Sequence, residues 1–153
     1  MMSFWDRYFV HREIWEDCHL GFTFQHHNLD TRDLQSVTAL LVDHFIPMPI
    51  GGGTRLNSLK PSCLHLVSND DGISLTENML NVALNYSSNY EMPNAEPNSV
   101  VAAFFAEFRN PLVYSNTLID SDHFYPTTNH TVDRLICCVD EHQLGCMLTC
   151  EDE

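Results

Sequence analysis

Apolar residues recur at helical spacing in some segments of this chain and alternate with polar residues in others. Residues 4–17 predict a short helix, because aromatic and apolar side chains return there every three or four positions. A second helix is predicted to begin at a cap formed by Asp30 or Thr31 and to end before Pro47. Its apolar stripe consists of Leu34, Val37, Leu41 and Phe45.

Three shorter runs are typical of strands. They cover residues 20–24, residues 63–67 and residues 112–119. The second run is followed by Asn-Asp-Asp-Gly at residues 69–72, which predicts a turn. Residues 47–61 contain three prolines and three consecutive glycines, so we expect a loop there.

Two further helices are expected in the middle of the chain. Ser74 and Glu77 have the spacing of a capping box, and the apolar residues that follow up to Tyr86 keep helical spacing. The same segment also alternates as a strand does, but its length and capping signal favour a helix. Residues 101–108 predict another helix, which Pro111 ends.

The C-terminal region is predicted to hold a last helix. Asn129 or Thr131 would cap it, and it would run to about Gln143, with Gly145 as its terminator. The elements together predict an α+β fold, a single compact helix-rich domain around a small sheet, with an all-α domain as the alternative. We expect that domain to span residues 1–146, followed by an acidic C-terminal tail over residues 147–153.

Charge narrows the classes of partner. The 153 residues include 21 acids and 7 bases, which gives a formal net charge of −14. A surface with this much negative charge repels nucleic-acid phosphates and anionic membranes. We therefore expect neither of them as a partner. A protein partner with a basic surface fits this charge better. The charge alone would also serve solubility.

The sequence predicts a cytoplasmic or nuclear protein. The first residues lack the apolar stretch of a secretory signal, and no apolar run is long enough to span a membrane. Six cysteines in such a context are expected to be reduced thiols. Lys60 is the only lysine, which leaves few sites for ubiquitin attachment and would suit a protein that persists in a host cell. Compositional bias would produce the same scarcity.

The last seventeen residues hold four cysteines and offer a candidate metal site. Cys138, His142, Cys146 and Cys150 follow one another at intervals of four residues. On a helix that spacing places side chains one above the other, and a turn at Gly145 could bring the last two cysteines back to the same ion. Thiolate and imidazole ligands suit zinc. The alternative is that these cysteines are buried in the core.

The chain's last residues also resemble a short binding motif. Leu148-Thr149-Cys150-Glu151-Asp152 is similar to the L-x-C-x-E motif with which several viral proteins bind retinoblastoma-family pocket proteins, with aspartate in the place of glutamate. The resemblance implies that Leu148 and Cys150 anchor the segment in a groove of a protein partner. The acids Glu151, Asp152 and Glu153 would then meet a basic rim.

These observations favour a non-enzymatic, acidic protein-interaction factor over an enzyme. A viral accessory protein, an immunity protein and a secretion chaperone are three versions, and the size, charge and element order loosely resemble the small acidic chaperones of type III secretion. A small zinc protein that uses the C-terminal cysteines and histidine is the second hypothesis. A cysteine-dependent enzyme is the third, although no cysteine has the local sequence of a known catalytic family.

Overall fold

The structure is a computed structural model, and it describes residues 20–26, 33–44, 59–85, 97–117, 125 and 132–151. The predicted helix over residues 4–17 lies outside these residues, and so does the predicted loop at residues 47–61 except for its last three positions. Among the described residues, no helix has the length and apolar character needed to cross a bilayer.

Helices and strands mix along the chain. The first half contains β1 (Leu20–His26), α3 (Leu34–His44), the 3-10 turn η2 (Pro61–Cys63), β2 (His65–Val67) and α4 (Asn69–Asn85). The second half contains α5 (Pro97–Ala106), β3 (Leu112–Ser115), β4 (Val132–Val139) and β5 (Gln143–Glu151). The fold is therefore α+β, as the sequence predicted.

The five strands form one antiparallel sheet in the order β1-β5-β4-β3-β2. β4 lies at the centre and pairs with β5 through a hairpin, in which Cys137 is opposite Cys146. The two edges are formed by β1, which pairs with β5, and by β2, which pairs with β3. The C-terminal hairpin thus occupies the middle of the sheet.

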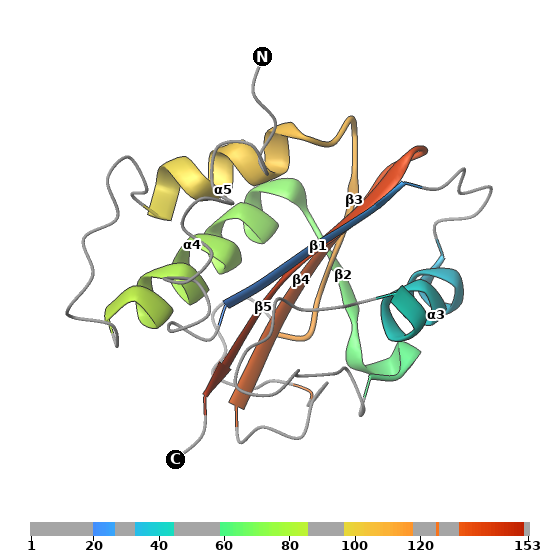
Figure 1. Ribbon diagram of the computed structural model, residues 1–153, viewed down its shortest axis with the longest axis horizontal. Coiled ribbons are helices and arrows are strands. Elements are labelled where there is room, and N and C mark those ends of the chain that lie inside the picture. The colour runs from blue at the N-terminus through green and yellow to red at the C-terminus, as the bar shows by residue number, and fades with distance from the viewer. Residues whose placement is uncertain are drawn as a thin grey trace.

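Both faces of the sheet are covered (Figure 1). α4 and α5 lie side by side on one face, and α3 with η2 lies on the other. Because successive strand residues point to opposite faces, Cys138 and Met147 pack under α4 and α5, whereas Cys137 and Leu148 pack toward α3. The central strands are therefore apolar on both sides.

Close packing of α4 on the sheet explains a glycine within this helix. A Cβ atom at Gly72 would lie 2.7 Å from Cγ1 of Val113 on β3, which is too close for two carbon atoms. α4 begins earlier than predicted, because the Ser68 hydroxyl accepts a hydrogen bond from the Asp71 N–H and caps the helix. The predicted turn at residues 69–72 is instead the first turn of this helix.

The start of α3 also differs from the prediction. The Asp33 carboxylate accepts a hydrogen bond from the Ser36 N–H at 2.8 Å, so Asp33 caps this helix rather than Asp30 or Thr31. Of the predicted stripe, Val37 and Leu41 are fully buried, and Leu34 is half-buried against the same cluster. Phe45 lies outside the described residues. The predicted strands at residues 20–24, 63–67 and 112–119 each contain an observed strand, β1, β2 and β3. β2 begins only at His65, because Cys63 ends η2, and β3 ends at Ser115.

The prediction of a last helix is wrong. Residues 132–139 and 143–151 are the two strands of the central hairpin, and Gly145 lies within β5 instead of ending a helix. Consequently the boundary drawn at residue 147 falls inside a strand. β5 continues through Glu151, which the tail interpretation did not anticipate.

One carboxylate holds the turn of this hairpin. Oδ1 of Asp140 accepts hydrogen bonds from the N–H groups of His142 and Gln143, and Oδ2 accepts one from the N–H of Arg109, 2.9 Å away. Burial of the carboxyl group acts to raise its pKa, but the three donors and the nearby His142 outweigh burial and lower the pKa of Asp140. Asp140 therefore ties the hairpin turn to the segment between α5 and β3.

We expect Asp140→Asn to lower the free energy of unfolding by about 1–3 kcal/mol, because one N–H would face an amide group that is itself a donor. The lowered pKa means that Asp140 stabilises the fold fully above its ordinary pKa of about 3.9, and that this contribution disappears as the pH falls through the lowered folded-state value. Denaturation of wild type and variant between neutral and acidic pH should show the difference narrowing in acid.

Glu141→Gln is the matched control for that experiment, because Glu141 is exposed in the same turn. Equal losses of stability in both variants, or a difference that persists unchanged into strong acid, would contradict the role given to Asp140.

Candidate functional site

The central hairpin carries all four residues predicted to bind zinc, but it does not bring their side chains to one point. Cys138 faces the α4 and α5 layer, whereas Cys146 faces α3 on the opposite side of the sheet. His142 is exposed in the turn beyond both of them. Cys150 lies four residues further along β5 than Cys146, about 13 Å away along a strand.

These side chains are separated because the segment forms two strands instead of the predicted helix. Intervals of four residues align side chains on a helix but spread them along a strand. Among the described residues, no group of three or more histidine, cysteine or acidic side chains is placed to hold a metal ion. The side chain of Cys150 lies outside the described part of the structure.

Three thiols of the hairpin lie in surroundings that favour their protonated form. Cys137, Cys138 and Cys146 are each fully buried, and no disulfide joins them. Burial raises the pKa of all three thiols, and for Cys138 the nearby Cys137 and Asp140 add to the effect. A nucleophile or a metal ligand needs the thiolate form, which this environment disfavours. These cysteines fill space as small apolar side chains.

The resemblance to a pocket-binding motif also falls on β5. Leu148 is completely buried, packs on the α3 side of the sheet and pairs with Leu135 of β4. The backbone of Cys150 and Glu151 pairs with Asp133 and Val132 at the end of the same ladder. Asp152 and Glu153 lie outside the described residues. An anchoring role for Leu148 would require this end of β5 to leave the sheet.

Comparisons with protein-family models, with curated proteins and with solved structures found no match for this chain.

The edge strand β2 has a feature that the sequence prediction did not single out. Leu66 lies on this edge with 60% of its surface exposed, whereas Leu64, just before the strand, is buried. The pattern Leu64-His65-Leu66-Val67 gave no sign that the second leucine faces solvent, because alternation in a short strand does not reveal which strand is at an edge.

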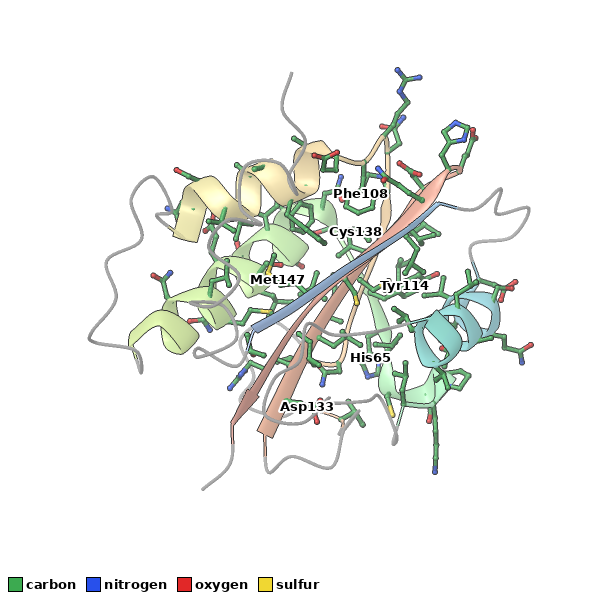
Figure 2. The ribbon with its side chains drawn as sticks, in the orientation of Figure 1. His65, Phe108, Tyr114, Asp133, Cys138 and Met147 are labelled. Atoms are coloured by element: carbon green, nitrogen blue, oxygen red, sulfur yellow. The ribbon has the colours of Figure 1, made fainter. Side chains whose placement is uncertain are left out.

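A buried polar network beside β3 was also missed. The Asn116 side-chain amide donates to the carboxylate and the carbonyl of Asp133 and to the carbonyl of Tyr125, and its oxygen accepts from the N–H of Leu135. The Tyr125 ring in turn lies 4.8 Å from the ring of His65 on β2. Figure 2 shows His65 and Asp133 toward the end of the sheet away from Phe108. An asparagine within a strand-like run was the only signal in the sequence.

The burial of the hairpin thiols predicts their reactivity. In the native protein we expect Cys137, Cys138 and Cys146 to resist alkylation by iodoacetamide even at mildly alkaline pH, because burial keeps them protonated and out of reach. All three should react promptly in denaturant. Mass spectrometry of peptides from native and denatured samples measures both states, and rapid native labelling of any of the three would contradict the described packing.

The position of Leu148 predicts the effect of shortening it. Leu148→Ala should lower the free energy of unfolding by about 2–5 kcal/mol, as expected for a leucine that is fully enclosed. Deletion of residues 147–153 should prevent cooperative folding, because it removes half of β5. Leu66→Ala is the matched control and should change stability little, since this leucine is exposed.

Thermal and chemical denaturation of the three variants measure these effects. A chain shortened to residue 146 that melts at the wild-type temperature would show that the segment is separable and would restore its interpretation as a tail.

Proposed function

We propose that this chain is a non-enzymatic interaction domain that binds a protein with a basic surface, in the cytoplasm or the nucleus. The observation that carries the proposal is the charge of the chain, with 21 acids against 7 bases. Opposite charges on two proteins raise the rate of productive encounter and select against partners of the same sign.

The solvent-facing side of α4 illustrates how these acids are presented. Asp70 is exposed in the first turn, Asp71 and Glu77 are half-buried, and the helix contains no lysine or arginine. Polar residues complete its exposed side, among them Asn78 and Asn81. This face offers negative charge without a basic residue of the same helix to neutralise it.

The state of the cysteines supports an interaction domain over the cysteine-dependent enzyme. Cys137, Cys138 and Cys146 are buried with raised pKa values, and Cys63 is buried as well. A catalytic cysteine is normally accessible to its substrate and has a lowered pKa. Among the described residues, Cys137, Cys138 and Cys146 form no disulfide, which also suits a reducing compartment.

Two surfaces of the chain are candidates for binding such a partner, and they differ in whether binding requires a structural rearrangement. The C-terminal segment with Leu148, Cys150 and the acids that follow can act as an anchor only if β5 leaves the sheet. The acidic surface needs no rearrangement, since Asp70 is already exposed. Our proposal therefore assigns the first contact to the acidic surface.

The test begins with purification of the full chain from its native cell and identification of the retained proteins by mass spectrometry. For a retained partner, we expect the association rate constant to fall by about tenfold or more as salt rises from low ionic strength to about 0.15 M, where the Debye length is about 8 Å. A partner whose association rate is indifferent to salt would remove the argument from charge.

Paired substitutions then locate the charge. Asp70→Asn combined with Glu77→Gln should slow association and leave the dissociation rate nearly unchanged, because charges at the rim of an interface act mainly on encounter. Asn78→Gln combined with Asn81→Gln on the same helix is the neutral control. An equal effect of both pairs would show that α4 contributes shape rather than charge.

A further inference from the structure

We infer that the edge of β2, which pairs only with β3 among the described strands, binds an extended basic segment of a partner protein by strand addition. This inference rests on the proposed function and names the form in which the basic partner is recognised. It is carried by Leu66, whose side chain is exposed and whose main-chain N–H and C=O point away from β3 at one edge of the sheet.

The direction of the main-chain groups follows from the hydrogen bonds of the sheet. In an antiparallel ladder, each residue points its N–H and C=O to one neighbouring strand, and successive residues alternate. The N–H of Asn116 donates to the carbonyl of Leu135, which continues the β3–β4 register and turns Tyr114 toward β4. Val113 and Ser115 must then turn toward β2.

The same alternation continues into β2. Val67 and His65 are the partners of Val113 and Ser115, so they use their main-chain groups within the sheet. Leu66, opposite Tyr114, points its N–H and C=O away from β3 and out of the sheet. In the part of the chain that the structure describes, no hydrogen bond uses either group of Leu66.

The side chain of Leu66 adds an apolar contact at the same point. It is 60% exposed, whereas Val67 beside it packs against the core under α4. An unpaired edge with an exposed apolar side chain is a template for pairing with another strand. A residue paired with Leu66 would form two main-chain hydrogen bonds and contact the leucine side chain. In strand addition, the main-chain hydrogen bonds supply affinity and the side-chain contacts supply specificity.

The charge next to this edge determines the occupant. β2 leads directly into α4 (Figure 1), whose first turn carries Asp70 and Asp71. Side chains on either side of the residue paired with Leu66 would point to the face that α4 covers. Asp70 and Asp71 begin that helix, shortly after β2 ends at Val67. The exposed base Lys60 lies at the other end, before η2. An apolar residue flanked by arginine or lysine fits this arrangement.

A peptide of nine alternating arginines and valines, with arginine at both ends, is the probe for the full chain. On saturation we expect the Leu66 amide to exchange with solvent at least tenfold more slowly, because its N–H becomes bonded to the peptide. The His65 amide is the internal control and should keep its rate, since it is already bonded to β3. Hydrogen exchange followed by nuclear magnetic resonance reads both amides.

Two methylated forms of the peptide separate strand addition from charge. Methyl groups on the valine nitrogens remove the donors that face β2 and should weaken binding at least tenfold. Methyl groups on the main-chain nitrogens of the arginines would point away from β2. They should weaken binding far less, although the peptide keeps the same charge. Equal effects of the two forms would overturn the inference.

Leu66→Lys and Val42→Lys form a matched pair of protein variants, because Val42 is exposed on α3 and the charge change is the same. Only Leu66→Lys should lower the affinity for the peptide by at least tenfold. Salt-sensitive peptide binding without protection of the Leu66 amide would overturn strand addition and leave the proposed function standing. Absence of binding by this peptide and by every basic protein would overturn both.

Pairing of β2 with β2 of a second copy is the other possible occupant. Sedimentation of the wild type distinguishes it, because the inference expects a monomer in the absence of peptide. A dimer that Leu66→Lys dissociates would assign the edge to a second copy of the chain and overturn the inference.

Discussion

The fold depends on burial of the β4–β5 hairpin on both of its faces. β4 is the central strand, and all of its residues from Leu135 to Val139 are buried. Their side-chain-bearing partners on β5 are buried as well, namely Leu144, Cys146, Met147 and Leu148. Helices can cover a sheet on both sides only if its central strands are apolar on both sides. Cys137 and Cys146 meet this demand, since cysteine behaves in a core as a small apolar residue.

That two-sided burial also explains why the hairpin looked like a helix. A strand with one solvent-exposed face alternates between apolar and polar residues. The segment Leu135–Val139 is apolar throughout and therefore shows no alternation. The sequence did hold a signal for the turn. Asp140 accepts hydrogen bonds from the N–H groups two and three residues ahead, as aspartate commonly does in tight turns. The predicted last helix instead includes Asp140.

Elements with one exposed face were predicted well, because their patterns are local. The stripe through Val37 and Leu41 identified α3, and the run ending at Phe108 identified α5 within a few residues. The spacing argument for the zinc site assumed a helix where the structure has two strands. Whether Cys138 and Cys146 share a face depends on the secondary structure that contains them, so one wrong element changed every inferred neighbour. The exposure of Leu66 depends on strand order, which no local pattern encodes.

The charge of the chain and the open edge of β2 acquire a common explanation under our proposal. An exposed apolar edge is a hazard, since two copies of a chain can pair through it and aggregate. A net charge of −14 on every copy opposes that approach by mutual repulsion. The same charge attracts a basic segment to Leu66, so one property would both protect the edge against self-association and select its partner. Charges inserted into β2 itself would protect the edge equally well, but they would remove the apolar surface on which binding depends.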